Sequence, residues 1–205
     1  MQYENDNVRK VYDEIADHFD GTRTYTWQWI ADIITSLPKQ SLIYDIGCGN
    51  GRNMSIPNYN FIGVDNCDKF VNMCLKKKLN VVQSDMCCLP FKSDSADAVM
   101  SIASFHHLYT EERREKALLE MKRVVKPNGI ILLSVWSIEQ PKKTRRTFDK
   151  HGDTIVKWDK YGEIHERYYY IFDLKEILEL FDKCGLHMIQ TTWECGNEVF
   201  ILKPK

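Results

Sequence analysis

The sequence lacks the long apolar runs that mark membrane proteins and secreted precursors. No apolar stretch reaches the roughly 20 residues that a membrane-spanning helix requires. The first ten residues, MQYENDNVRK, contain no apolar core of the kind found in signal peptides. We therefore expect a soluble protein of the cytoplasm, or of the nucleus, that has no membrane partner.

Net positive charge and a cysteine framework are also absent. The 28 Lys and Arg residues are offset by 29 Asp and Glu residues, and the formal net charge of −1 excludes a generally basic nucleic-acid-binding protein. The seven cysteines are odd in number, and none lies in a C-x-x-C pair. We therefore expect reduced thiols, with neither a disulfide framework nor a bound metal.

What the sequence does contain is typical of a single α/β domain over residues 1–205. Apolar residues make up 43% of the chain and charged residues 28%, an ordinary globular balance. N-terminal helices are expected within residues 4–38. Short apolar strands then alternate with helices, which predicts a mostly parallel sheet of seven strands with helices on both faces. The expected strands are 41–45, 61–64, 81–83, 98–102 and 130–135, followed by a C-terminal antiparallel hairpin of 186–192 and 198–202.

One polar segment, residues 136–167, interrupts this alternation. It is rich in charge and shows no clear helical or strand period, so we expect an inserted lid or substrate loop. Within residues 142–160, seven Lys and Arg outnumber three Asp, a local excess of positive charge that fits contacts with RNA phosphates. The alternative is a solvated loop without a ligand. The candidate phosphate contacts are Lys142, Lys143, Arg145 and Arg146.

A glycine-rich turn follows the first expected strand, with the sequence Asp45-Ile46-Gly47-Cys48-Gly49-Asn50-Gly51. The dinucleotide fingerprint G-x-G-x-x-G would need glycine at position 52, which is Arg52. The pattern that remains, D-x-G-x-G-x-G, resembles the first motif of Rossmann-like methyltransferases. This resemblance implies that the turn and the acid before it hold S-adenosylmethionine. The residues assigned to that role are Asp45, Gly47, Gly49 and Gly51.

Two further acids stand at the ends of the next two strands. Asp65 is placed to accept hydrogen bonds from ribose hydroxyls, and Asp85 from the adenine amino group, because such sheets bind ligands at the carboxyl ends of their strands. A single acid at such a position is more often a loop or cap residue. Three of them beside a glycine turn indicate a cofactor site, to which we also assign Met86 and Arg23.

Further motifs resemble a narrower family. They are His106-His107, Arg113-Arg114, Trp136-x-x-Glu139-Gln140 and Arg167-Tyr168-Tyr169-Tyr170. Together they look like the eukaryotic tRNA wobble-uridine methyltransferases, which convert 5-carboxymethyluridine in the anticodon loop to its methyl ester. The resemblance implies that the chain acts on tRNA, releases S-adenosylhomocysteine and pairs as a heterodimer with a small zinc-binding activator subunit. Departures from the family pattern are Phe105, Pro127-Asn128-Gly129 and Gly196-Asn197-Glu198-Val199.

The implied reaction needs no general base. A carboxyl group with a reference pKa of about 4 is already ionised at neutral pH, so the enzyme has only to position the reactants and exclude water. Arg167 is our candidate for gripping one carboxylate oxygen while the other attacks. His106 or His107 is expected to line the pocket, with a structural role as the alternative for each. Tyr168 and Tyr169 are candidates for stacking on the base.

Two other functions stay open at this point. A methyltransferase of a small metabolite, such as a quinone precursor, would share the cofactor motifs but would favour a compact apolar lid over the basic one seen here. A catalytically silent cofactor-binding scaffold is the second alternative, and the intact acids, histidines and Arg167 argue against it. Mass spectrometry of tRNA nucleosides after incubation with cofactor distinguishes these functions.

Overall fold

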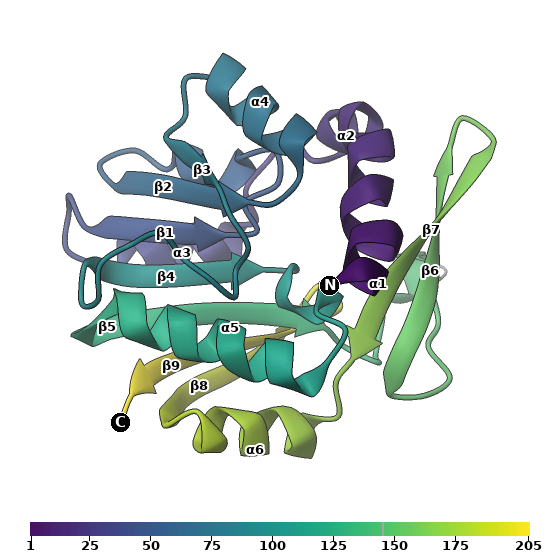
Figure 1. Ribbon diagram of the computed structural model, residues 1–205. Coiled ribbons are helices and arrows are strands. Elements are labelled where there is room, and N and C mark those ends of the chain that lie inside the picture. Colours follow the sequence, from purple (N-terminus) through teal and green to yellow (C-terminus); the bar gives the residue numbers. More distant parts are fainter. Residues whose placement is uncertain (145) are drawn as a thin grey trace.

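A seven-stranded sheet forms the centre of the computed structural model, which describes residues 1–144 and 146–205 (Figure 1). The strand order is β3-β2-β1-β4-β5-β9-β8. Strands β1 to β5 run parallel to one another, whereas β9 is antiparallel to both β5 and β8. The predicted mostly parallel sheet with a C-terminal antiparallel hairpin is confirmed. The strands are β1 (Leu42–Ile46), β2 (Asn60–Asp65), β3 (Val81–Gln83), β4 (Ala96–Ile102), β5 (Val125–Trp136), β8 (Leu186–Glu194) and β9 (Asn197–Pro204).

Burial and turn geometry explain why these strands form. In β1, the side chains of Ile43, Tyr44 and Ile46 are all buried, as expected for a parallel strand that is covered on both faces. Strands β8 and β9 are joined by Cys195 and Gly196, whose φ angles are both positive, at 52° and 87°. Such a pair closes a two-residue hairpin whose twist matches that of the flanking strands.

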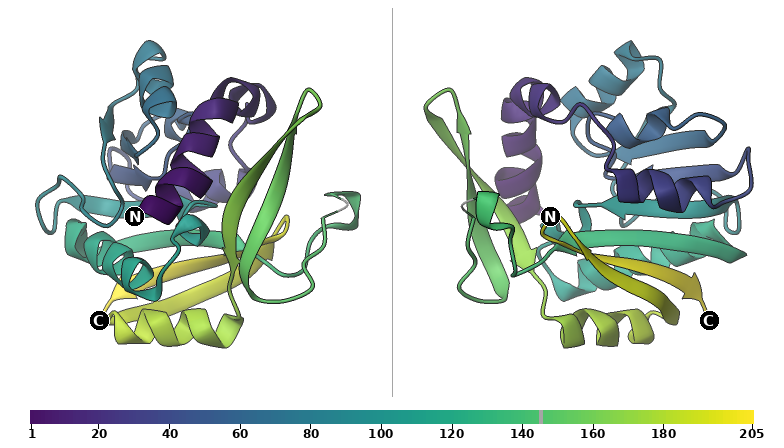
Figure 2. Two further views of the ribbon diagram at one scale, coloured as in Figure 1. Left: turned by 45° about the vertical axis from the view of Figure 1, so that its right-hand side comes forward. Right: turned by 180° about the vertical axis from the view of Figure 1, so that it is seen from behind.

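Helices cover both faces of the sheet, and an apolar core lies on each side of it (Figure 2). One core includes Leu118 of α5 and Phe181 of α6, and the other includes Ile30 and Ile34 of α3 with Cys74 of α4. Within the described parts of the chain, no helix is long and apolar enough to cross a membrane. The helices on the sheet are α3 (Gln28–Thr35), α4 (Asp68–Lys76), α5 (Glu111–Val124) and α6 (Leu174–Lys183).

The N-terminal segment lies over the loops that follow β3 and β4. It starts as α1 (Gln2–Glu4), passes through a π-helical turn at Asn5–Arg9 and continues as α2 (Lys10–Thr22). Glu4 accepts a hydrogen bond from the N–H of Tyr109, in the loop after β4. Figure 1 shows α2 standing between the sheet and a separate hairpin. This helix therefore covers the edge at which the parallel strands end.

The segment 136–167, expected as a loop, folds in its second half into an antiparallel hairpin that pairs with itself and not with the main sheet (Figure 2). Tyr161 and Gly162, with φ angles of 55° and 92°, form its turn. Sequence analysis did not detect the alternation of apolar and polar residues that is typical of a strand, because buried positions of this hairpin carry polar side chains such as His165 and Arg167. The two strands of this hairpin are β6 (Gly152–Lys160) and β7 (Glu163–Ile171).

Replacing Leu118 by alanine should lower the free energy of unfolding by about 2–5 kcal/mol, because truncation of this fully buried side chain leaves a cavity between α5 and the sheet. The matched control is Leu119→Ala. Leu119 is the next residue on the same helix and is 44% exposed, so its truncation should change the free energy of unfolding by no more than about 0.5 kcal/mol. Urea denaturation measures both, and equal effects would contradict the assigned buried face of α5.

Candidate cofactor and substrate site

The turn after β1 accepts only glycine at two of its positions. Gly47 and Gly51 both have φ angles of 75°, a left-handed conformation that residues with a side chain rarely adopt. A Cβ atom on Gly47 would collide with Oγ of Ser104, and one on Gly51 would collide with the side chain of Leu79. The backbone of the turn therefore packs more closely against its neighbours than any other residue type would allow.

Two acids at strand ends are buried beside this turn. Asp65 accepts hydrogen bonds from the N–H groups of Gly49 (2.8 Å) and Cys67 (2.9 Å). Burial raises the pKa of Asp65 to about 6, although these hydrogen bonds act in the opposite direction. Burial, and then repulsion from Asp65, raises the pKa of Asp45 to about 7. Oδ2 of Asp45 is buried without a hydrogen-bond partner among the described residues, and Asp45 does not line the pocket beside the turn.

A pocket extends from the glycine turn to the N-terminal helix. It brings together five of the predicted cofactor residues, namely Gly47, Gly49, Asp65, Asp85 and Met86. The closely packed turn and the unpaired acceptor of Asp45 fit S-adenosylmethionine, whose methionine moiety carries an ammonium group. Gly51 shapes the turn from outside the pocket lining. Arg23 also lies outside the lining, and its guanidinium carbon is 5.4 Å from the ring centre of Phe19.

Asp85 is engaged by an arginine that sequence analysis did not assign to the site. Arg113 contacts Asp85 through Nη2 (2.7 Å to Oδ2) and both oxygens of Glu4 through Nε (2.8 Å each). Burial acts to raise the pKa of Asp85, but the N–H of Cys87 and the Arg113 guanidinium together hold it below its ordinary value. Glu4 and Arg113 line the same pocket. The only indication in the sequence that Arg113 belongs to this site was its place in the Arg113-Arg114 family motif.

His106 and His107 follow β4 and are both buried. Burial lowers the pKa of His107 to about 3 and that of His106 well below its ordinary value, so both are neutral. Nδ1 of His107 lies 2.8 Å from the carbonyl oxygen of Tyr168 and must donate, which leaves Nε2 as an acceptor. The N–H of Trp136 donates to Nδ1 of His106 (3.1 Å), so the proton of that ring is on Nε2, which has no partner among the described residues. His106 therefore offers a donor, not a base.

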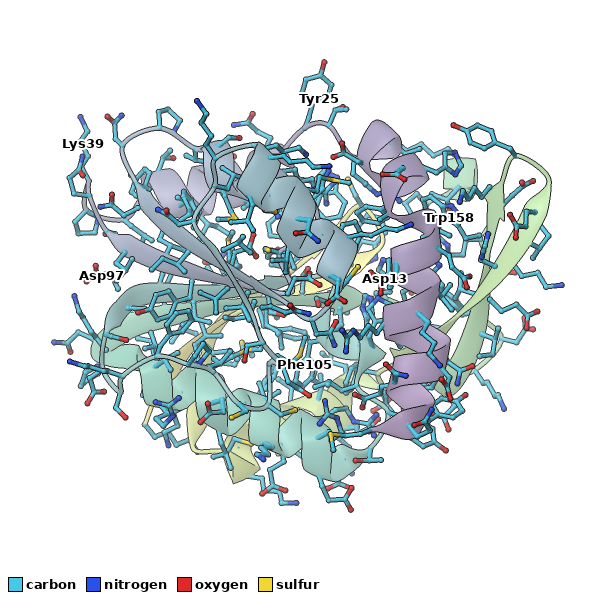
Figure 3. All side chains as sticks on the ribbon, turned by 45° about the horizontal axis from the view of Figure 1, so that its top comes forward. Asp13, Tyr25, Lys39, Asp97, Phe105 and Trp158 are labelled. Atoms are coloured by element: carbon cyan, nitrogen blue, oxygen red, sulfur yellow. The ribbon has the colours of Figure 1, made fainter. Side chains whose placement is uncertain are left out.

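Arg167 is a buried cation that contacts no carboxylate among the described residues. Its side chain is 3% exposed, and its guanidinium carbon lies 4.8 Å from a ring centre of Trp158 and 5.2 Å from that of Tyr169. Figure 3 shows Trp158 between the hairpin and α2, where its Nε1 donates to Nδ1 of His18 (3.1 Å). Nη1 of Arg167 donates to the hydroxyl of Tyr12 (3.2 Å), whereas Nε is buried without an acceptor. The cluster therefore offers charge and unused donors to an anion.

Arg146 lies beside this cluster and is held in one orientation. Its guanidinium carbon is 4.0 Å from the ring centre of Trp136, and its Nη1 donates to Oε1 of Gln140 (3.3 Å). Trp136 in turn stacks on Tyr169, with ring centres 4.1 Å apart. Burial lowers the pKa of Arg146. The Trp-x-x-Glu-Gln motif thus supplies both the ring and the amide that orient this arginine.

The other predicted RNA contacts lie in different surroundings. Lys142 and Lys143 are exposed on a single 3₁₀ turn after β5, and Arg145 lies outside the described residues. Tyr168 does not join the Arg167 cluster, because successive residues of β7 point to opposite faces of the hairpin. Its side chain is fully buried, and its hydroxyl donates to Asp153 (2.7 Å). Tyr168 is therefore placed to support the fold and not to stack on a base.

The raised pKa values of Asp45 and Asp65 predict that S-adenosylhomocysteine binds more weakly in acid. Protonation below about pH 6 removes acceptor capacity from Asp65, so the affinity measured by calorimetry should fall about tenfold between about pH 8 and pH 5.

The stability of the cofactor-free protein should depend on pH in the opposite direction. Because both acids have pKa values above the unfolded value, their contribution is present below about pH 4 and is lost as the pH rises through about 6 to 7.

The variant Asp65→Asn should bind the product weakly at pH 8 and should lose the part of the pH dependence that is centred near pH 6. Asp94→Asn is the matched control, since Asp94 is exposed and precedes β4 at the opposite end of the sheet. An unchanged pH dependence in Asp65→Asn would show that another group titrates.

Residues 44–133 match the model of a methyltransferase domain family. A relative from Arabidopsis thaliana is 44% identical over 68% of this chain and 35% of its own length, and one from Mus musculus is 37% identical over 78% and 24%. This chain thus spans about a third or less of these two relatives. A relative from Schizosaccharomyces pombe is 34% identical over 96% of both chains. All three are named tRNA (carboxymethyluridine(34)-5-O)-methyltransferase.

Solved structures share the fold at much lower identity. A methyltransferase from Methanosarcina mazei superposes with a TM-score of 0.72 at 18% identity, covering 88% of this chain and 98% of its own. A chain from the complex of the Haloferax volcanii Trm112 methyltransferase activator with a methyltransferase gives a TM-score of 0.68 at 18% identity, covering 97% and 98%. These likenesses show the shared fold, and the sequence relatives show that the chain belongs to the tRNA (carboxymethyluridine(34)-5-O)-methyltransferase family of S-adenosylmethionine-dependent enzymes.

Proposed function

We propose that the chain methylates the carboxylate of 5-carboxymethyluridine at the wobble position of a tRNA anticodon and so forms the methyl ester. The names of its relatives point to this substrate. The observation that carries the proposal is the state of Arg167, a buried guanidinium that no carboxylate of the described residues contacts and whose Nε has no acceptor. A substrate carboxylate would supply both the opposite charge and the acceptor.

The neighbouring histidines support carboxylate chemistry, because neither is able to act as a base near neutral pH. The pKa of His107 is about 3, and its Nε2 is already occupied by the hydroxyl of Tyr12 (2.9 Å). His106 carries its proton on Nε2 and lies against Tyr169, with ring centres 4.7 Å apart. A hydroxyl or amine nucleophile would need a group that removes its proton, whereas an ionised carboxylate does not.

The residues of the chain then act by binding and orientation. When bound, S-adenosylmethionine supplies an electrophilic methyl group on a sulfonium sulfur. Asp45 and Asp65 would hold its methionine and ribose parts beside the glycine turn. Arg167 would grip one oxygen of the substrate carboxylate and leave the other free to attack. The rings of Trp158 and Tyr169 exclude water from this charge pair, which strengthens it.

The RNA around the reactive base would meet the loop between β5 and β6. We assign Arg146 to the wobble nucleotide, because it is half-buried, oriented by Trp136 and Gln140, and close to the Arg167 cluster. The exposed Lys142 and Lys143 would contact phosphates further along the strand. The basic segment is thus divided into one oriented contact and a more diffuse electrostatic surface.

A small zinc-binding activator subunit would pair with the chain as a heterodimer along β3. This strand is an edge of the sheet, and it is only three residues long. Val82 on it and Leu75 on the neighbouring α4 are 36% and 54% exposed. Because β3 pairs with β2 next to Asp65 and leads directly to Asp85, a strand added at this edge would also stabilise the loops that hold the cofactor.

The test of the proposed function is single-turnover methylation of anticodon stem-loops that carry 5-carboxymethyluridine, with the activator present. The rate should stay nearly flat between about pH 6 and pH 9, because the substrate carboxylate is ionised throughout. Arg167→Lys should lose much of the rate, since an ammonium keeps the charge without the planar pair of donors. Arg167→Ala should lose more, with the affinity for S-adenosylhomocysteine unchanged.

The matched substrate is the same stem-loop with the amide in place of the acid, which should not be methylated. Equal turnover of the amide, a steep rise of the rate with pH, or an Arg167→Ala variant of normal rate would each contradict the carboxylate mechanism.

Removing the charges of Lys142 and Lys143 together should weaken stem-loop binding and flatten its dependence on salt, because fewer counterions are then released from the RNA. For two phosphate contacts, the slope of log K against log salt should decrease by about 1.4 to 1.8. Lys203→Gln with Lys205→Gln is the matched control, because these residues lie beside the start of β5, at the opposite end of the sheet from the loop that follows it. Filter binding at several salt concentrations measures these slopes. Equal slopes for the two double variants would show that this loop does not contact the RNA.

A further inference from the structure

Tyr12 lies where the cofactor pocket meets the Arg167 cluster. It projects from α2 and lines the pocket that contains the glycine turn, although sequence analysis assigned it to no site. Its hydroxyl oxygen has three partners: Nε2 of His107 at 2.9 Å, the hydroxyl of Tyr169 at 3.1 Å and Nη1 of Arg167 at 3.2 Å. One phenol oxygen therefore joins the loop after β4 to strand β7.

The direction of each hydrogen bond in this group follows from chemistry. Nδ1 of His107 donates to a carbonyl oxygen, so its Nε2 must accept, and the hydroxyl of Tyr12 is the donor. The oxygen of Tyr12 has then used its only proton, so it accepts from Nη1 of Arg167 and from the hydroxyl of Tyr169. The neutral His107 thus fixes the orientation of the phenol, and the phenol fixes the guanidinium.

The hydrogen bond to Tyr12 determines which edge of the Arg167 guanidinium is already engaged within the protein. Nη1 donates to the hydroxyl of Tyr12, and the side chain of Tyr169 is a further hydrogen-bond partner of the guanidinium. Nε, by contrast, is buried and has none. A guanidinium held at Nη1 keeps Nε, on its opposite edge, without an acceptor among the described residues, and the parallel N–H groups of Nε and Nη2 match the two oxygens of a carboxylate.

We propose that Tyr12 is a positioning residue for methyl transfer: its phenol oxygen holds Arg167 so that the Nε–Nη2 edge receives the substrate carboxylate. This inference rests on the proposed function, because it takes the carboxylate as the substrate group. It adds a residue of the N-terminal helix to the substrate site. It also gives His107 a role that needs no proton transfer, which is to orient the phenol.

The surroundings of Tyr12 make a clean substitution available. Its ring packs against Phe19 and Phe70, with ring centres 5.8 Å and 6.0 Å away, and against the ring of His107. Tyr12→Phe therefore keeps the ring contacts and removes only the hydroxyl. Tyr3→Phe is the matched control, since Tyr3 lies on the same helical segment and its hydroxyl makes no hydrogen bond within the described residues.

The first measurement is single-turnover methylation of the 5-carboxymethyluridine stem-loop by the enzyme with its activator. Tyr12→Phe should lower the rate about 10- to 100-fold, as expected for the loss of an orienting bond to a charged group, while the affinities for S-adenosylhomocysteine and the stem-loop change less than about threefold. Tyr3→Phe should retain the wild-type rate. In the Arg167→Ala background, Tyr12→Phe should cause no further loss, because its effect passes through that arginine. Additive losses, or a normal rate for Tyr12→Phe, would overturn the proposal.

The second measurement does not depend on turnover. In protein with labelled histidines and bound S-adenosylhomocysteine, the nitrogen resonances of His107 should show a protonated Nδ1 and a hydrogen-bonded Nε2, and Tyr12→Phe should shift Nε2 alone. A proton on Nε2 in the wild-type protein would overturn the proposal whatever the substrate is. If the wild-type enzyme instead shows the expected resonances but leaves the stem-loop unmethylated, the proposed substrate is wrong, and with it the carboxylate that Tyr12 is proposed to serve.

Discussion

The chemistry of the site depends on one buried positive charge that the protein does not neutralise. Arg167 lies among aromatic rings and phenol oxygens, and no carboxylate of the described residues contacts it. Desolvation of a guanidinium is unfavourable, and attraction to the rings of Trp158 and Tyr169 acts against it. An anionic ligand, such as the carboxylate proposed above, would add the opposite charge that the described residues do not supply. Under the proposed function, selectivity for a negatively charged group would then be present in the folded chain before the substrate binds.

The two halves of the site come from different parts of the chain. The ends of β1 and β2 supply the glycine turn with Asp45 and Asp65, whereas β7 supplies Arg167. The N-terminal helix covers both halves, because Glu4 reaches Arg113 on the cofactor side and Tyr12 reaches Arg167 on the substrate side. A methyl donor and its acceptor enclosed beneath one helix are protected from water, which would otherwise compete for the methyl group.

The fold and the cofactor half could be predicted because their signals are local. The strand and helix periods, the glycine turn and the acids at strand ends each lie within a few residues. The substrate half was less accessible. Tyr12 belongs to an apolar helical stripe, and its period does not distinguish a packed ring from a hydrogen-bonded hydroxyl. Glu4 and Arg113 are 109 positions apart, and the inward residues of β7 are polar, so neither the ion pair nor the hairpin had a local pattern.

The independence of the hairpin β6–β7 has a mechanical consequence. Its strands form a two-stranded sheet of their own, without a backbone ladder to the main sheet. It rests on α2 through side-chain contacts such as Trp158 to His18 (3.1 Å) and Lys160 to the carbonyl oxygen of Glu14 (2.7 Å). The hairpin is thus joined to the rest of the protein by buried side chains and by hydrogen bonds such as that between His107 Nδ1 and the carbonyl oxygen of Tyr168, and not by a shared strand ladder. Because the two sheets share no backbone hydrogen bonds, a shift of the hairpin would leave the pairing of the strands beside the glycine turn unchanged.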